Sequence, residues 1–253
     1  MIAITRAVSP SINNCELTYH AREPIDLVKA IAQHKAYESL LAELGCEVIS
    51  LPAEPDLPDA VFVEDPVVVV DEVAVILHMG AASRRPEART LAGALSRYRP
   101  LKYLIAPGTM DGGDVLRIGR KIFVGLTNRT NGEGIAQLRD ILHPYGYDVQ
   151  SVEVKNCLHL KTACSYIGNN TILINRSFID AALFQEFELL DIPGDEPNAA
   201  NVIFVKDVII IPESFPKTRA MLERRGLKVR SVDILELQKA ESGITCSSVI
   251  FQR

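Results

Sequence analysis

The chain has 253 residues, 47% of them hydrophobic, and a formal net charge of −5 at pH 7. This length and apolar content suit a globular protein with one large domain or two small ones. The acidic balance, without any block of lysine or arginine, argues against a nucleic-acid partner, and no apolar run approaches the roughly 18 residues that a membrane helix needs.

The first predicted elements form a strand, helix and strand in succession. Residues 2–5 are predicted as a strand, residues 24–44 as a helix with Pro24 in its first turn, and residues 47–51 as the closing strand. Four β-hairpins with short polar or glycine-bearing turns follow along the chain. Their paired strands are residues 67–70 with 73–77, 115–118 with 122–124, 166–167 with 171–174, and 202–205 with 208–211.

Each hairpin is predicted to lead into a helix and a further strand. Three helical apolar faces stop at Gly45, Gly146 and Gly226, which suit the left-handed position after a helix, and a valine-centred strand follows each glycine. The apolar period is least regular around residues 178–187, where the third hairpin should be followed by its helix. The order strand, strand, helix, strand therefore occurs four times.

A fifth unit is complete only if the two ends of the chain pair. Residues 247–251 have the alternating pattern of a strand and would supply the partner that residues 2–5 lack. We therefore predict one α/β domain over residues 1–253, a propeller of five ββαβ units with five-fold pseudo-symmetry, closed by pairing of the N- and C-terminal strands. A linear α/β chain of two domains is the alternative.

Polar residues recur just before the first hairpin strand of successive units. They follow one another about every 45 residues and are Glu64 with Asp65, Asp111, His159, Asn201 and Cys246. Equivalent positions in units arranged around one axis converge near that axis. Two or three carboxylates, a histidine and a thiol should therefore share one pocket, a set typical of a hydrolase.

The chemistry of this set follows from its residue types. A thiolate attacks carbon when an imidazolium or a cationic ligand stabilises it, so Cys246 is a candidate nucleophile and His159 a candidate proton carrier. Asp111 could orient the imidazole, while Glu64 and Asp65 could bind a planar cation such as guanidinium.

Each of these residues also has a purely structural interpretation. Cys246 would then be a small buried side chain, His159 a core histidine, and Asp111 a turn residue before two glycines. Arg84 and Arg129 lie in predicted loops, where they could clamp a carboxylate at the far end of a cationic ligand or simply be solvated surface charges.

Six segments of the chain resemble, in order and spacing, the dimethylarginine dimethylaminohydrolases: residues 58–65, 111–115, 129–131, 158–161, 199–201 and 245–247. The resemblance covers nearly the whole chain and implies the five-fold propeller of the guanidine-modifying enzymes. It implies a hydrolase of C–N bonds in linear amidines, which converts Nω-methylated arginine to citrulline and methylamine or dimethylamine through a covalent S-alkylthiouronium intermediate. The implied partner is a small guanidino amino acid, with no cofactor or metal.

The resemblance also implies individual roles. Cys246 would be the nucleophile, His159 the acid that protonates the leaving amine and then the base that activates water, and Asp111 the group that holds His159 and the guanidinium. The implied substrate contacts are the guanidinium with Asp65 and the adjacent Glu64, the carboxylate with Arg84 and Arg129, and the α-amine with Asp59 and the carbonyl groups of Leu17 and Ala240.

Two other functions remain open. An arginine deiminase or an amidinotransferase uses the same residue types, although those enzymes are usually longer, and a non-catalytic propeller such as the ribosome anti-association factor would only bind. Residues 77–80 and the loop of residues 11–22 differ from the pattern of the resembled family. These differences leave the choice of substrate open.

The cysteines and the polar N-terminal segment indicate the cellular compartment in which the protein is expected. The five cysteines are odd in number and lack the paired spacing of zinc sites, so we expect free thiols in a reducing compartment. The N-terminal segment becomes polar before the apolar core of a signal peptide develops, which indicates a cytoplasmic protein. A homodimer formed through exposed propeller edges is left open.

Overall fold

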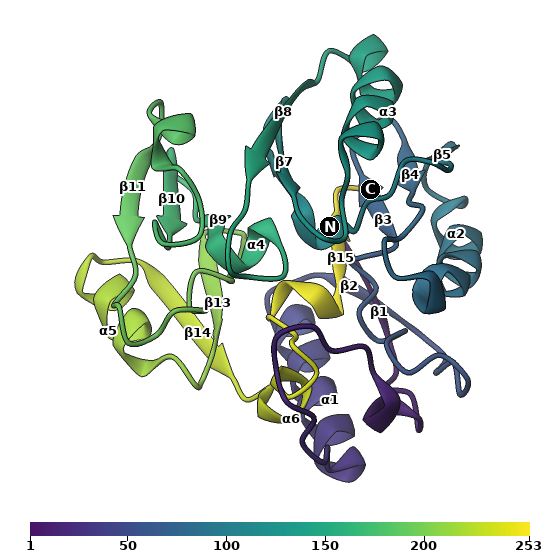
Figure 1. The fold of residues 1–253 in the computed structure, drawn as a ribbon. Helices are drawn as coiled ribbons and strands as arrows, with labels where there is room; N and C mark the ends of the chain where they lie inside the picture. Colours follow the sequence, from purple (N-terminus) through teal and green to yellow (C-terminus); the bar gives the residue numbers. More distant parts are fainter.

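The computed structural model describes residues 1–253, and its strands form five separate three-stranded sheets (Figure 1). In each sheet an antiparallel pair of strands is extended by a third strand that runs parallel to its neighbour in the pair. The sheets are β15 (Val249–Phe251), β1 (Ile2–Arg6) and β2 (Glu47–Leu51); β3 (Val67–Val69), β4 (Ala74–Ile76) and β5 (Leu101–Tyr103); β6 (Val115–Ile118), β7 (Lys121–Leu126) and β8 (Asp148–Glu153); β9 (Cys164–Tyr166), β10 (Thr171–Ile174) and β11 (Glu188–Asp191); and β12 (Ile203–Val205), β13 (Val208–Pro212) and β14 (Lys228–Val232). The predicted α/β fold of five repeated units is confirmed.

A helical segment connects the second and third strands of each sheet. These segments are α1 (Leu27–Glu43), α2 (Ala88–Leu95), α3 (Gly132–Leu142), a 3₁₀ turn at Ala181–Phe184, and α5 (Pro216–Arg224). Two shorter helices, α4 (Leu160–Ala163) and α6 (Leu235–Gln238), lie outside these connections. The helix predicted over residues 178–187 is wrong, because only the 3₁₀ turn forms where the apolar period is irregular.

The ends of the long helices follow from local chemistry. Helix α1 begins at Leu27 rather than at Pro24, because the Asp26 side chain accepts a hydrogen bond from the Lys29 N–H and caps the helix there (3.0 Å). At the other end, Gly45, Gly146 and Gly226 have φ angles of 77°, 75° and 77°. The left-handed glycines predicted to turn the chain from helix into strand are therefore confirmed.

The two ends of the chain share one sheet, as predicted. Strand β15 pairs antiparallel with β1, Ile2 lies opposite Phe251 and Ile4 opposite Val249, and the labels N and C lie close together in Figure 1. The terminal strand begins at Val249 rather than at residue 247, because residues Thr245–Ser247 form a 3₁₀ turn. Closure of the ring and a single domain stay predictions.

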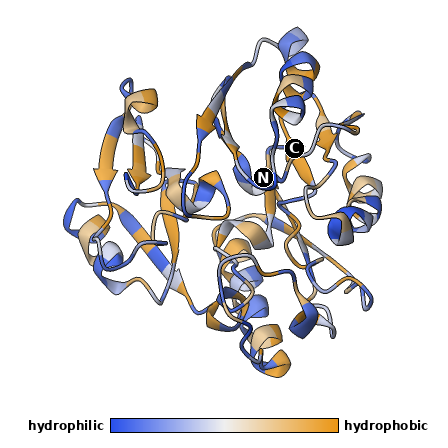
Figure 2. Ribbon diagram, viewed as in Figure 1, coloured by the Kyte–Doolittle hydropathy of each residue, from blue (hydrophilic) through white to orange (hydrophobic).

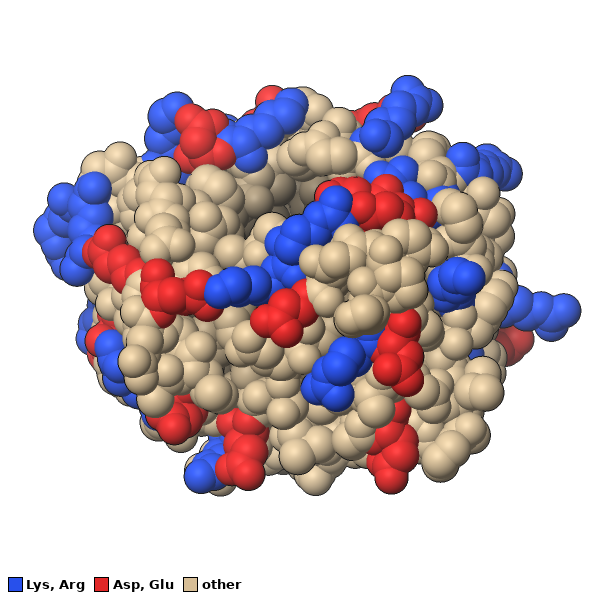
Figure 3. All heavy atoms as spheres, turned by 90° about the horizontal axis from the view of Figure 1, so that it is seen from above, with Lys and Arg blue, Asp and Glu red and all other residues tan.

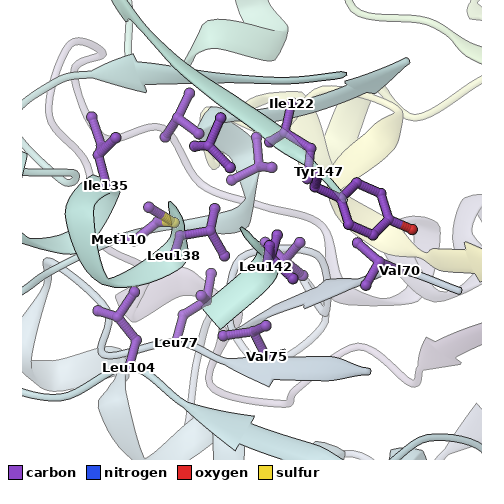
Figure 4. Close-up of a cluster of buried hydrophobic side chains, with 14 of the residues drawn as sticks. Val70, Val75, Leu77, Leu104, Met110, Ile122, Ile135, Leu138, Leu142 and Tyr147 are labelled. Atoms are coloured by element: carbon purple, nitrogen blue, oxygen red, sulfur yellow. The ribbon is translucent and has the colours of Figure 1, made fainter. Parts of the chain in front are cut away.

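Hydrophobic side chains pack between neighbouring units and fix their relative positions. One cluster joins Val75 and Leu77 from the β3–β5 unit to Leu138 and Leu142 of α3 (Figure 4). Figure 2 shows the hydrophobic residues concentrated in the strands and the hydrophilic ones in turns and on outer helix faces. Burying one such leucine stabilises the fold by about 1.5–3 kcal/mol, so the loops that precede the strands are held on a rigid base.

The surface charge and the helices can be compared with what a nucleic-acid or membrane partner would require. Acidic and basic side chains are interspersed over the face shown in Figure 3, without an extended basic surface. None of the helices combines the length and the apolar character needed to cross a membrane.

Candidate active site

The loops before the first strand of each unit are joined by a circuit of hydrogen bonds. Each loop is bonded to the loop of the next unit, and the links are Glu64 N–H to Cys246 O (3.1 Å), Gly112 N–H to Asp65 O (2.8 Å), Leu160 N–H to Asp114 Oδ1 (2.9 Å), Asn201 Nδ2 to Lys161 O (3.0 Å) and Thr245 N–H to Asn201 Oδ1 (3.1 Å). Residues about 45 positions apart in sequence therefore meet at one place.

This convergence leaves a small closed pocket of about 20 Å³, room for about one water molecule. Most of the predicted site residues line it, and Glu64, Asp111 and Leu17 do not. The lining residues are Glu16, Asp59, Phe62, Asp65, Arg84, Arg129, Leu158, His159, Ala240, Glu241, Ser242 and Cys246.

His159 stands among three carboxylates at the start of α4. Its Nε2 lies 3.3 Å from Asp111 Oδ2 and its Nδ1 lies 4.0 Å from Asp65 Oδ1. Burial opposes the charged imidazole, but Asp114, Asp65 and Asp111 outweigh it and raise the pKa of His159 to about 9. The imidazolium is therefore the resting form at neutral pH, held by a fully buried Asp111 behind it.

Gly113 lets the imidazole and the Asp65 carboxylate approach the backbone. A Cβ atom at this position would lie 2.4 Å from His159 Nδ1 and 2.9 Å from Asp65 Oδ1. The Gly113 N–H also donates to Asp65 Oδ1 at 3.2 Å. The pair of glycines after Asp111 thus makes room for the site rather than only a turn.

Asp65 is paired with Arg84 inside the protein. Arg84 Nη1 donates to Asp65 Oδ2 at 2.8 Å, and its Nη2 and Nε donate to the two oxygens of Glu87 at 2.8 and 3.0 Å. Burial favours the protonated form of Asp65, but Arg84 and His159 outweigh it and lower the pKa of this carboxyl group. Arg84 therefore lies beside Asp65, the carboxylate that is predicted to bind the guanidinium.

Arg129 has a donor without an acceptor. Its Nη2 donates to the Thr18 hydroxyl at 3.1 Å, whereas Nη1 is buried and has no hydrogen-bond partner. Buried polar atoms are nearly always hydrogen-bonded in folded proteins. An unpaired guanidinium nitrogen on the pocket wall is therefore suited to bind an anionic group.

Cys246 lies in the 3₁₀ turn Thr245–Ser247, just before β15. The residue is 9% exposed and lines the pocket. Burial, followed by the charges of Asp65 and Glu64, raises the pKa of Cys246 to about 12, although hydrogen bonds from Gly243 and Ser242 favour the thiolate. The thiol is therefore protonated at neutral pH in the absence of a ligand.

Three predicted residues lie outside the pocket. The Glu64 carboxylate contacts Lys161 and accepts a hydrogen bond from Thr245 Oγ1 (2.7 Å), so it points away from Asp65 and neutralises a partly buried lysine. Asp111 lies behind His159, and the Leu17 side chain packs with Ala240 and Cys246 in one apolar cluster. The expectation that Glu64 and Asp111 both reach a bound guanidinium finds no support in this geometry.

Residues 11–22, called the lid below, fold over the pocket. The Glu16 N–H donates to Asp59 Oδ2 at 3.1 Å, and the carboxylate of Glu241 accepts hydrogen bonds from lid backbone groups. A wider pocket of about 320 Å³ adjoins the small one and shares Leu158, Glu241 and Ser242 with it. The lid thus separates the thiol and the imidazolium from solvent.

Sequence reasoning missed four acidic residues at or around the site: Glu16, Glu87, Asp114 and Glu241. Asp114 could have been found from the sequence, because it directly follows the two glycines after Asp111. Glu87 stands three residues after Arg84, a spacing that lets two side chains meet on a helical turn. Glu241 has no local signal, because its partners lie more than 200 positions away, as for Thr18 with a separation of 223.

The sequence comparisons give consistent matches over the whole chain. Residues 6–246 match the family model described as N,N dimethylarginine dimethylhydrolase, eukaryotic. The chain is 36% identical over 250 residues to an N(G),N(G)-dimethylarginine dimethylaminohydrolase of Pseudomonas aeruginosa, with 98% of each protein covered. It is 37% identical over 250 residues to the protein of the same name from Streptomyces coelicolor, with 98% of this chain and 95% of that protein covered.

Solved structures show the same architecture. A cysteine-to-serine mutant of the Pseudomonas aeruginosa enzyme in complex with citrulline superposes with a TM-score of 0.94 at 34% identity, covering 98% of both chains. The N-terminal domain of a cyanobacterial arginine dihydrolase superposes with a TM-score of 0.84, covering 98% of this chain and 96% of that one. Its identity is only 17%, so this second likeness concerns the fold alone.

Proposed function

The chain belongs to the dimethylarginine dimethylaminohydrolase family, and we propose that it hydrolyses Nω-methylated arginine to citrulline and methylamine or dimethylamine. Members of this family are hydrolases that act on C–N bonds in linear amidines, and the chain is one of them. The observation that carries the specific proposal is a single closed pocket that holds the Cys246 thiol, the His159 imidazolium and the Asp65 carboxylate together.

The charges of the pocket favour a guanidinium ligand. Asp65 is ionised and lines the pocket, where a planar cation can donate hydrogen bonds to its carboxylate in place of water. A guanidinium bound there lies next to Cys246 and stabilises its thiolate, so that the thiol releases its proton to solvent when the positively charged substrate binds. Nucleophile and substrate are thereby activated in the same step.

The reaction then follows from the positions of the thiol and the imidazolium. The Cys246 sulfur forms a bond to the guanidinium carbon, and the bond from that carbon to the methylated nitrogen breaks as His159 donates its proton to the leaving amine. The neutral His159 next takes a proton from water, whose oxygen adds to the carbon of the S-alkylthiouronium. The C–S bond breaks as the proton of the added hydroxyl group passes to the departing sulfur, so that citrulline, the Cys246 thiol and the protonated His159 remain. Asp111 keeps the imidazole oriented through both steps.

The protein also has groups that are complementary to the α-carboxylate and α-amine of the substrate. The unpaired Nη1 of Arg129 can bind the α-carboxylate, and Asp59 with the carbonyl groups of Leu17 and Ala240 can bind the α-amine. Arg84 is already occupied by Asp65 and Glu87, so we assign it to holding Asp65 in place rather than to the substrate carboxylate. Because the closed pocket holds about one water molecule, the lid must open before the substrate enters.

All five cysteines are unpaired and buried. This supports our placement of the protein in a reducing compartment, the cytoplasm.

Product analysis tests the proposed function. Citrulline, amines and ammonia should be measured side by side with asymmetric dimethylarginine, monomethylarginine and arginine as substrates, with Cys246→Ser as the inactive control. Citrulline with dimethylamine or methylamine is the expected result. Citrulline and ammonia from arginine alone would make the protein a deiminase, and no citrulline from any of the three would overturn the proposal.

A further inference from the structure

A single carboxylate fastens the lid to the segment that carries the nucleophile. Glu241 Oε1 accepts hydrogen bonds from the backbone N–H groups of Thr18 (2.9 Å), Tyr19 (2.5 Å) and His20 (2.5 Å). Its neighbours Ala240 and Ser242 line the catalytic pocket. Three successive amides of the lid therefore converge on one side chain, only a few positions before the thiol.

The backbone of Glu241 is in a conformation that glutamate rarely adopts. Its φ angle is 58°, in the left-handed region, where a residue with a Cβ atom is strained. Such residues persist where their surroundings hold them, and they cluster at active sites and ligand clamps. The left-handed turn directs the carboxylate of Glu241 toward the lid.

Two other contacts of the lid use groups that the proposed function assigns to the substrate, whereas the hydrogen bond from the Ser83 hydroxyl to the Glu16 carboxylate does not. Asp59 accepts from the Glu16 N–H at 3.1 Å, and Arg129 donates to the Thr18 hydroxyl at 3.1 Å. The proposed function assigns Asp59 to the α-amine of the substrate and Arg129 to its carboxylate. A bound substrate competes with the lid for both residues, whereas the proposed function assigns no part of the substrate to Glu241.

We propose that Glu241 is a positioning residue that keeps the lid closed over the bound substrate. Through Thr18 it places the adjacent carbonyl group of Leu17 for the α-amine, and it excludes bulk water from the covalent intermediate. This inference rests on the proposed function and assigns to Glu241 the recognition of the amino-acid end of the substrate. Glu241 acts through the lid and does not itself touch the reacting atoms.

The decisive variant is Glu241→Gly, because glycine accepts the left-handed backbone while the carboxylate is lost. We expect its kcat/KM for asymmetric dimethylarginine to fall about 10- to 100-fold, since a displacement of about 1 Å can cost 10²-fold in rate. Alkylation of Cys246 by iodoacetamide without substrate, followed by peptide mass spectrometry, should become about tenfold faster because the lid opens more often. Glu241→Gln keeps an acceptor oxygen, so its kcat/KM and its alkylation rate should be intermediate between those of the unaltered protein and those of Glu241→Gly.

A matched control is Asp207→Gly. Asp207 is also an acidic residue with a left-handed backbone (φ 63°), but it lies in the turn between β12 and β13. Its variant should leave both rates unchanged, and thermal unfolding should show that both glycine variants are folded. A merely structural role for Glu241 would not raise thiol reactivity while lowering turnover.

Two results would overturn the proposal: alkylation of Cys246 in Glu241→Gly at the rate of the unaltered protein, or full turnover by that variant. If the unaltered protein makes no citrulline, the proposed function fails, and the alkylation rates still decide whether Glu241 holds the lid.

Discussion

Replacing Asp65 by asparagine tests whether its charge binds the guanidinium. Asparagine has nearly the same shape, so Asp65→Asn removes a negative charge from the pocket without opening a cavity. In the unaltered protein this carboxylate is 2% exposed and lies 2.8 Å from Arg84 Nη1. The variant leaves Arg84 paired with Glu87, whose two oxygens it still contacts. We therefore expect a folded protein that binds cations poorly.

The size of the effect follows from the kind of interaction that is lost. Hydrogen bonds to charged groups are worth about 1.5–3 kcal/mol. Since each 1.4 kcal/mol is a tenfold change, the Kd for dimethylarginine should rise about 10- to 150-fold. Citrulline carries a neutral ureido group and makes no ion pair with Asp65. Its Kd should change less than about threefold, because an asparagine oxygen still accepts a hydrogen bond.

Isothermal titration calorimetry in the Cys246→Ser background measures both Kd values without turnover. Glu87→Gln is the matched control, since Glu87 also pairs with Arg84 but does not line the pocket. Glu87→Gln should lower the unfolding temperature about as much as Asp65→Asn does, without weakening dimethylarginine binding more than citrulline binding. Equal losses of dimethylarginine and citrulline binding in Asp65→Asn would refute the assignment of Asp65 to the guanidinium.

Three further predictions concern the chemical step. Cys246→Ser should abolish citrulline formation with an unchanged unfolding temperature, and residual turnover above about 1% would contradict the covalent mechanism. Asp114→Asn should lower the pKa of His159 from about 9, because the Asp114 charge helps to raise it. In a plot of kcat against pH, the alkaline limb, where the imidazolium is lost, should therefore move to lower pH. An alkaline limb at the same pH as in the unaltered protein would contradict this prediction. Gly113→Ala should reduce kcat/KM about 100-fold by displacing His159, whereas Gly93→Ala, where a Cβ meets nothing within 4 Å, should be silent in the same assay.

Much of the fold could be predicted because its signals are local and repeated. A glycine after a helix and a short turn between β-branched strands each act over a few residues, and the repeat multiplies them. The same repeat predicted which residues meet, since Asp65, His159 and Cys246 occupy equivalent positions in different units. The 3₁₀ turn at Ala181–Phe184 was missed because its apolar pattern is irregular, although Asp180 caps it by accepting a hydrogen bond from the Ala182 N–H at 2.9 Å.

The orientation of side chains could not be predicted from the repeat. Glu64 and Asp65 are neighbours in sequence, yet one faces Lys161 and the other faces the pocket, and only the local turn decides which. The pairing of Arg84 with Asp65 depends on how deeply the loop that carries Arg84 packs into the protein. The bond from Glu241 to the lid joins segments about 220 positions apart, for which the chain has no local pattern.

The circuit of hydrogen bonds among the five loops also bears on how the protein is made. Asp65, Asp111 and His159 precede Cys246 along the chain, and β15, which follows the thiol, pairs with β1 at the opposite end. Contacts of such long sequence separation form late, because loop-closure entropy opposes them until the intervening units are ordered. A growing chain therefore carries its acids and its imidazole without a nucleophile, and the reactive thiol enters the pocket only when the last unit docks.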